Sequence, residues 1–256
     1  MTTAALYCVY DDSLWLDYSC RSIYEAVDAI YFFVSDKPWK GPFKDKTSTL
    51  EAIRALPDPA GKIEIIEGHW EAEHEQRNLS LGYAQYHGHD YGLVIDADEV
   101  YETQNLQNAL VHARSRPEVD VWHIRCATYW KSLRYRIDPP EPYDPPTLIR
   151  LGSCGFIKAR NTATDKNALM PPEIATYHHM SYARPDDDLR RKISTFDHAD
   201  LVLEHWYEDV WKRWDRSPGM QNLHPVNPPQ YGRAVEQNPM LIPTILLPVW
   251  QKGGLP

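Results

Sequence analysis

The sequence predicts an α/β protein with a mostly parallel sheet and helices on both faces of that sheet. Over the first 100 residues, apolar runs of strand length alternate with segments of helical periodicity, which is typical of parallel sheets. The fourth apolar run, Leu93-Val-Ile95, ends abruptly in the carboxylates of Asp96, Asp98 and Glu99. Ligands bind in open α/β sheets just beyond such strand ends, so this acidic segment is the first candidate site.

Apolar runs predict four strands in this first part of the chain, at residues 4–10, 29–34, 62–66 and 91–95. Between them, we expect a helix opened by residues 11–13 and capped by Ser13, a helix over 47–56 and a helix over 71–86. In the last of these, Ala72, Leu79, Tyr83 and Tyr86 recur at helical spacing and are expected to form one face of the helix.

The pattern changes after residue 100, and a mixed region is predicted. We expect helices at 103–113, 186–196 and 204–214, strands at 119–128, 147–151 and 155–159, and a proline-rich loop at 138–146. From Ser217 onward proline is frequent and periodicity is lost. The predicted organisation is a catalytic domain over residues 1–200, followed by a C-terminal helix and an extended tail over 201–256 packed on it.

Composition and charge limit the class of protein. The 256 residues carry a net charge of -9, which argues against a chain that mainly grips nucleic acid phosphates. The four cysteines lack C-x-x-C spacing, so reduced thiols in a cytoplasmic protein are the simplest expectation. We find neither a signal peptide pattern nor an apolar stretch long enough to span a bilayer.

The acidic segment predicts a site for a hard cation. Asp96 and Asp98 would point to the same side of an extended strand, and carboxylate oxygens suit Mg²⁺ or Mn²⁺. The alternative is a solvated turn before a helix, with acidic residues near the helix start. The segment alone does not separate these two interpretations.

The sequence resembles the GT-A glycosyltransferases, in particular the bacterial family-2-like group, over roughly residues 4–200. The resemblance depends on the order of three segments: Glu75-Gln76-Arg77-Asn78 on a helix, Asp96-Ala97-Asp98-Glu99 after the fourth strand, and His179-Met180-Ser181-Tyr182-Ala183-Arg184 followed by Arg191-Lys192. It implies a GT-A (Rossmann-like) fold and transfer of a sugar from a nucleotide-sugar donor. The sequence departs from the group after the second strand, where it reads Ser35-Asp36-Lys37-Pro38.

The resemblance implies a role for each candidate residue at the donor site. Asp98 and His179 would bind Mn²⁺ or Mg²⁺, with His178 as a neighbouring alternative to His179. The UDP-sugar would be contacted by Tyr10, Asp36, Arg77, Asp96 and Lys192. Other interpretations stay open, since Arg77 could pair with Glu73 on its own helix, Asp36 could form a turn and Lys192 could face solvent.

The acceptor side is less defined by the sequence. Trp130 and Lys131 are candidates for an acceptor platform, although aromatic side chains are often part of a core. Glu173 is a candidate for the catalytic base that takes the acceptor proton, together with Asp96 as a catalytic residue. Asp138, Glu141 and Asp144 in the proline-rich loop are rivals for the base.

Two other classes of protein fit parts of the same pattern. The segment 93–100 also fits the nucleophile motif of haloacid-dehalogenase-like phosphohydrolases, with Asp96 as nucleophile, although that motif usually lies near the N-terminus. The other alternative is a non-catalytic nucleotide-sugar-binding module. The identities of the sugar and the acceptor do not follow from the sequence.

Overall fold

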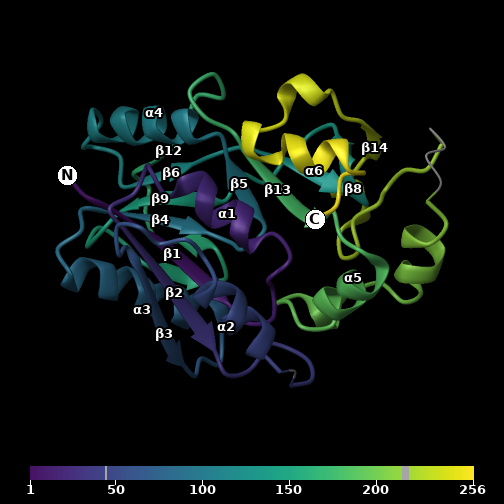
Figure 1. Ribbon diagram of the computed structural model, residues 1–256, viewed down its shortest axis with the longest axis horizontal. Coiled ribbons are helices and arrows are strands. Elements are labelled where there is room, and N and C mark those ends of the chain that lie inside the picture. The colour runs from purple at the N-terminus through teal and green to yellow at the C-terminus, as the bar shows by residue number, and fades with distance from the viewer. Residues whose placement is uncertain (44, 215–218) are drawn as a thin grey trace.

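The computed structural model describes residues 1–43, 45–214 and 219–256, and it contains one large and one smaller sheet beside a two-stranded hairpin (Figure 1). The large sheet has seven strands in the order β12 (Asn167–Leu169), β6 (Val121–His123), β9 (Pro146–Arg150), β4 (Tyr91–Ile95), β1 (Thr3–Val9), β2 (Ala29–Ser35) and β3 (Ile63–Gly68). All of them except β9 run in one direction. The predicted mostly parallel sheet is therefore confirmed.

Helices cover both faces of this sheet, as predicted. One face packs against α1 (Leu16–Ile23), α2 (Thr47–Arg54) and α4 (Thr103–Arg114), and the other face packs against α3 (Glu73–Tyr86). The central strands β1, β2 and β4 are apolar on both sides because both sides are buried. Gly92 on β4 lies where a Cβ atom would come within 2.8 Å of the Leu6 side chain, so this strand approaches β1 closely.

A second sheet of five strands stands beside the first and carries much of the later sequence (Figure 1). Its order is β14 (Arg233–Glu236), β8 (Ser132–Asp138), β7 (Cys126–Trp130), β13 (Tyr177–Tyr182) and β5 (Glu99–Tyr101). Next to it lie α5 (Asp186–Ile193), α6 (Leu247–Gln251), the hairpin β10 (Phe156–Lys158) with β11 (Asn161–Thr162), and short 3₁₀ turns at Ala199–Leu201, Pro228–Gln230, Pro239–Leu241 and Thr244–Leu246. Two apolar clusters cover this sheet, and one of them is rich in tryptophan.

The predicted strand over residues 119–128 is divided between the two sheets. Residues 121–123 form β6 in the large sheet, and residues 126–130 form β7 in the second sheet. The strand prediction was therefore right about extended backbone but wrong about continuity, because the break at Ile124-Arg125 allows the chain to change sheets. The strands β5, β8 and β13 were not predicted.

One local prediction about helices was wrong, and the predicted apolar face of α3 is only partly buried. The first helix starts at Leu16 rather than at residues 11–13, because the Asp12 carboxylate accepts hydrogen bonds from Arg184 and is engaged away from the helix end. In α3, Leu79 and Tyr86 are exposed, whereas the buried face includes Gln76, Arg77 and Leu81. Arg77 lies on the inner face of α3 because its guanidinium pairs there with Glu73 and Asp96.

The C-terminal part of the chain contributes to the second sheet. The strand β14 pairs with β8, and residues of α6 pack on the cluster that contains Val100 and Leu133. The predicted helix at 204–214 is a single π-helical segment, Tyr207–Trp211. Residues 217 and 218, where the predicted tail begins, lie outside the described part of the chain. Within the described residues, we find no helix that combines the length and apolar character needed to cross a bilayer.

Candidate functional site

A cavity of about 680 Å³ lies beyond the carboxyl ends of β1 and β4, and residues of both sheets line it. The volume falls within the range typical of sites for small molecules and cofactors. The segment after β1 contributes Tyr10 and Asp12, and the turn after β4 contributes Asp96 and Asp98. The cavity therefore occupies the position at which open α/β sheets bind ligands.

Asp96 lies in a turn between β4 and β5, and two arginines hold its carboxylate. Arg77 Nη2 donates to Asp96 Oδ1 at 2.9 Å, and Arg160 Nη1 donates to Oδ2 at 3.1 Å. Burial opposes the charged carboxylate, but the two guanidinium groups outweigh this effect and lower the pKa of Asp96. Because the motif forms a turn, the strand alternation used in the prediction does not apply, although both aspartates line the cavity.

Glu99 shares one of these arginines. Arg160 Nη1 donates to Glu99 Oε1 at 2.8 Å, and the Glu99 side chain is fully buried. Burial raises the pKa of Glu99 even though Arg160 opposes the change. Glu99 also accepts from the Asp96 backbone N–H at 3.2 Å and therefore stabilises the turn that carries Asp96 and Asp98.

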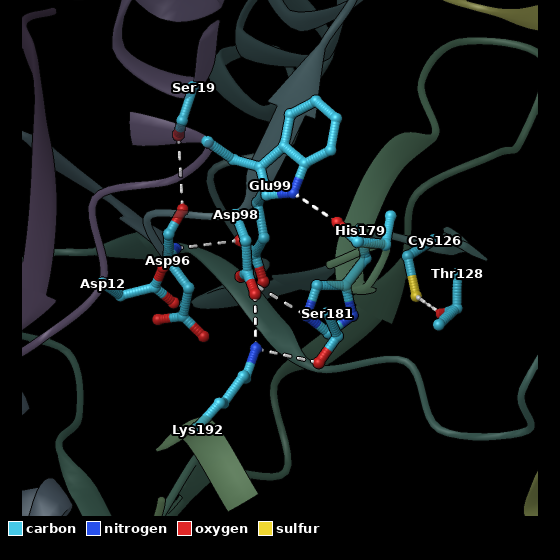
Figure 2. A network of polar contacts seen from close by, with 12 residues as sticks. Asp12, Ser19, Asp96, Asp98, Glu99, Cys126, Thr128, His179, Ser181 and Lys192 are labelled. Atoms are coloured by element: carbon cyan, nitrogen blue, oxygen red, sulfur yellow. Dashed lines mark hydrogen bonds and ion pairs between the residues drawn. The ribbon is translucent and has the colours of Figure 1, made fainter. Parts of the chain in front are cut away.

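Asp98 is the most heavily paired carboxylate of the three. Its Oδ2 atom accepts from Arg184 Nη2 at 2.7 Å and from Lys192 Nζ at 2.5 Å. Its Oδ1 atom faces His179 Nε2 at 3.6 Å, and Figure 2 shows Asp98 between Lys192 and His179. Burial disfavours the charge, but Lys192, His179 and Arg184 together hold the pKa of Asp98 well below its usual range, so Asp98 is a carboxylate at neutral pH.

His179 stands between two carboxylates on opposite sides of its ring. Its Nε2 atom faces Asp98, and its Nδ1 atom lies 3.9 Å from Glu141 Oε1. Burial favours the neutral ring, but Asp98 and Glu141 outweigh burial and raise the pKa of His179. The neighbouring His178 has a different partner, since its Nδ1 atom lies 2.8 Å from the Tyr129 hydroxyl. Burial lowers the pKa of His178 to about 4.

Six of the predicted site residues line this one cavity: Tyr10, Arg77, Asp96, Asp98, His179 and Lys192. Arg77 is only 1% exposed and also donates to Glu73 at 2.7 Å, so the alternative pairing within its own helix is present, whereas its pairing with Asp96 was not predicted. The guanidinium holds Asp96 in place rather than standing free in the cavity.

Four other predicted residues do not line the cavity. Asp36 follows β2, and its Oδ1 atom pairs with His69 Nδ1 at 2.9 Å on the surface. Glu173 is exposed and lies apart from the cavity lining. Trp130 is fully buried among other tryptophans, and the Lys131 ammonium lies 3.7 Å from the centre of the Trp211 ring. A buried ring and a lysine engaged in this way do not form an open acceptor platform.

Arg160 and Glu141 are cavity residues that were not given a role at the donor site from the sequence. Arg160 lies between β10 and β11, where no periodicity or motif marks it. Glu141 belongs to the proline-rich loop and was a rival for the base, and its side chain accepts from Thr128 and from Gln230 Nε2 at 3.1 Å. Burial would raise its pKa, but His179, Thr128 and Cys126 lower the pKa of Glu141 to about 2.

Comparisons with known proteins add the following. Neither a family model nor a curated protein matches the sequence. Among solved structures, the chain is similar to S. aureus TarS, with 14% identity and a TM-score of 0.45 over 70% of this chain and 37% of that one. It is also similar to S. aureus TarS 1-349 in complex with UDP, with 15% identity and a TM-score of 0.46 over 82% of this chain and 69% of that one.

A third similar structure is the mannosyltransferase PcManGT from Pyrobaculum calidifontis in complex with GDP-Man and Mn²⁺. Its identity is 16% and its TM-score 0.38, over 48% of this chain and 35% of that one. The chain thus spans little more than a third of the TarS and PcManGT chains. Likeness at these identities and scores is too weak to assign an activity.

Proposed function

We propose that this protein is a glycosyltransferase of GT-A type, which transfers a sugar from a nucleoside diphosphate donor, preferably a UDP-sugar, to an acceptor hydroxyl. The observation that carries the proposal is the pairing of Asp98 with His179 and Lys192 on the wall of a cavity beyond β1 and β4. Two of the three sequence segments that resemble GT-A enzymes, residues 96–99 and residues 179–184 with 191–192, supply these residues, which are far apart along the chain. Carboxylate, imidazole and ammonium groups together suit a diphosphate and its cation.

The donor set fits a hard divalent cation, Mn²⁺ or Mg²⁺, at Asp98 and His179. Asp98 Oδ2 is occupied by Arg184 and Lys192, whereas Oδ1 faces the imidazole Nε2. One carboxylate oxygen and one imidazole nitrogen are thus directed toward a common position, a combination that Mn²⁺ accepts. When bound, such a cation would neutralise negative charge on the leaving diphosphate.

The cationic side chains have different tasks in this proposal. The Lys192 ammonium lines the cavity and is partly exposed, so it can exchange part of its contact with Asp98 for a phosphate oxygen. Arg77 and Arg160 are held by Asp96 and keep the acidic turn in its shape. Tyr10 lines the cavity after β1 and is a candidate contact for the base.

The acceptor base stays unassigned among the carboxylates considered. Glu173 and the acceptor candidates Trp130 and Lys131 lie outside the cavity lining, and Glu141 lines it with a pKa near 2. A general base works best when its pKa is close to the working pH. We therefore propose that Glu141 positions His179, in the way that a carboxylate orients a metal-binding imidazole.

The rival phosphohydrolase requires Asp96 to act as a nucleophile. Both of its carboxylate oxygens accept from arginine, Oδ1 from Arg77 and Oδ2 from Arg160. A carboxylate held in this way is a poor nucleophile, since its negative charge is already shared with two cations. This arrangement favours a positioning role for Asp96 over the nucleophilic role.

The proposal is tested by thermal unfolding with UDP, CDP or GDP, each with and without Mn²⁺. We expect UDP to raise the midpoint only with Mn²⁺, because a ligand that binds the native state stabilises it by mass action. Asp98→Asn should abolish this shift, whereas the surface change Asp36→Asn should preserve it. A shift with GDP but not UDP would exclude the UDP donor, and an unaltered shift in Asp98→Asn would remove Asp98 from the metal site.

Donor consumption separates the enzyme from its alternatives. A transferase consumes a UDP-sugar and releases UDP, a phosphohydrolase releases inorganic phosphate, and a binding module leaves the donor intact. Because the acceptor is unidentified, slow donor hydrolysis by water is the probe. Metal-dependent UDP release above that of His179→Ala supports transfer chemistry, and inorganic phosphate as the first product contradicts it.

A further inference from the structure

Three chemically different metal-binding groups meet on the far side of His179 from Asp98. Cys126 on β7, Glu141 in the loop after β8 and His179 on β13 offer a thiol, a carboxylate and an imidazole within 4.8 Å of one another. Cys126 Sγ donates to Glu141 Oε1 at 3.1 Å, and His179 Nδ1 lies 3.9 Å from the same oxygen. Figure 2 shows Cys126 and Thr128 beyond the imidazole, away from Asp98.

The composition of this cluster differs from that of the Asp98 site. Its thiol is the group that the Asp98 site lacks, and thiolate ligands select thiophilic cations such as Zn²⁺ over Mg²⁺ and Mn²⁺. Zinc bound by three protein ligands in a tetrahedral site keeps one open position. Because all three residues line the cavity, an open position would face its interior. The ligand atoms of a tetrahedral zinc site lie closer together than the widest pair does here. The side chains would have to move by about 1 Å to reach that spacing.

The surroundings of Glu141 support a built site. Its carboxylate accepts from the Thr128 hydroxyl and from Gln230 Nε2 at 3.1 Å, so two neutral donors orient it without neutralising its charge. Such partners around a ligating carboxylate are typical of metal centres. Cys126 is 7% exposed, and the Glu141 side chain 8%, so the two groups are held nearly out of solvent.

We propose that Cys126, Glu141 and His179 form a second metal site, specific for a thiophilic divalent cation of the Zn²⁺ class, and that its occupation excludes a cation from Asp98 and His179. Binding converts the thiol to a thiolate, and the Sγ proton is released to solvent. A neutral imidazole has one nitrogen lone pair for a metal, and its other nitrogen carries a proton. Coordination through Nδ1 therefore places the proton on Nε2, where it faces Asp98.

The exclusion of a cation from Asp98 and His179 rests on the proposed function, whereas the site formed by Cys126, Glu141 and His179 does not. When Nδ1 of His179 binds Zn²⁺, the Nε2–H group can donate to Asp98 Oδ1. The cation proposed at Asp98 then loses its imidazole ligand. Zinc would therefore inhibit the proposed sugar transfer by changing the tautomer of His179. Both sites are predicted to share His179 but no other ligand.

The site is tested by titrating the purified protein with Co²⁺, a spectroscopic substitute for Zn²⁺. We expect a thiolate-to-cobalt charge-transfer band in the near ultraviolet, one cobalt per chain, and displacement by Zn²⁺. Cys126→Ser should lose the band. Cys8→Ser, which changes another thiol of the same cavity, and Cys154→Ser should retain it. Circular dichroism confirms that each variant is folded.

Two results would overturn the site: absence of the band in the wild-type protein, or its persistence in Cys126→Ser. Asp98→Asn should keep the band, because Asp98 is not a ligand of this site. If that variant stays folded and loses the band, the cobalt sits at Asp98 and the proposed cluster is wrong. None of these readouts depends on nucleotide binding, so they stand even if the proposed function fails.

Exclusion is tested by adding one equivalent of Zn²⁺ to the UDP and Mn²⁺ unfolding assay. We expect Zn²⁺ to remove the Mn²⁺-dependent shift in the wild-type protein and in Cys8→Ser, but to leave it in Cys126→Ser. An equal loss of the shift in all three proteins would mean that Zn²⁺ competes directly at Asp98, and the mutual exclusion would be refuted.

Discussion

The Arg184 guanidinium donates to Asp98 Oδ2 at 2.7 Å across a sequence separation of 86 residues, and both side chains are almost completely buried. The same guanidinium donates to Asp12 Oδ2 at 2.8 Å and to Asp188 Oδ2 at 2.9 Å. These three acids belong to the loop after β1, the turn after β4 and the helix α5. A single buried cation thus joins the three segments that surround one end of the cavity.

Removal of this cation should destabilise the whole protein. We expect Arg184→Gln to lower the free energy of unfolding by about 3–5 kcal/mol, because breaking a buried ion pair leaves a charge without compensation. Urea unfolding measures the change. Arg190→Gln is the matched control, since Arg190 pairs with Glu208 at half-exposed side chains and should cost less than about 1 kcal/mol. Equal effects would contradict the central role of Arg184.

Trp130 should behave as a core residue rather than as an acceptor contact. Its ring is fully buried and lies 4.9 Å from the Trp211 ring centre. We expect Trp130→Ala to lower the free energy of unfolding, measured in urea, by about 3–5 kcal/mol. Trp250→Ala should lower it by less, because Trp250 is half-buried. A Trp130→Ala protein that is as stable as the wild type would contradict the core role of Trp130 and return it to the acceptor candidates.

Lys192 and Asp36 should differ in their effect on nucleotide affinity. Lys192 Nζ lines the cavity, whereas Asp36 is paired with His69 outside it. Charge-assisted hydrogen bonds contribute about 1.5–3 kcal/mol, so Lys192→Met should weaken UDP binding in Mn²⁺ by roughly ten- to a hundredfold. Calorimetry should find Asp36→Asn unchanged. Loss of affinity in Asp36→Asn would return that residue to the nucleotide site.

His224 should make stability depend on pH. It accepts at Nδ1 from the backbone N–H groups of Val226 and Asn227, and burial lowers its pKa to about 4, with Glu141 opposing and His198 adding to the shift. The unfolded chain therefore binds the proton more readily, so the stabilisation present above pH 6.5 is lost as the pH falls toward 4.

The measurement compares urea unfolding of the wild type and His224→Asn between pH 7.5 and 4.5. The wild-type protein should lose roughly 2 kcal/mol more than the variant over this range. Parallel pH profiles of the two proteins would show that His224 titrates normally in the folded state.

Local sequence patterns predicted much of the large sheet and the position of the acidic turn. The strands at 91–95 and 29–34 and the helix at 103–113 depend on apolar runs and periodicity, which nearest neighbours along the chain determine. The patterns failed for α3, where Arg77 lies on the buried face. Its burial depends on Asp96, a partner 19 residues away, which periodicity does not report.

The sequence by itself determined the α/β class, the order of the early elements and the location of Asp96 and Asp98 after β4. Only the tertiary structure decided that Arg160, Arg184 and Lys192 compensate these acids, and that His179 stands between Asp98 and Glu141. Apolar periodicity is a local property of the chain, whereas an ion pair forms wherever folding brings opposite charges together. The partners of a buried charge therefore become known only when the sheets are assembled.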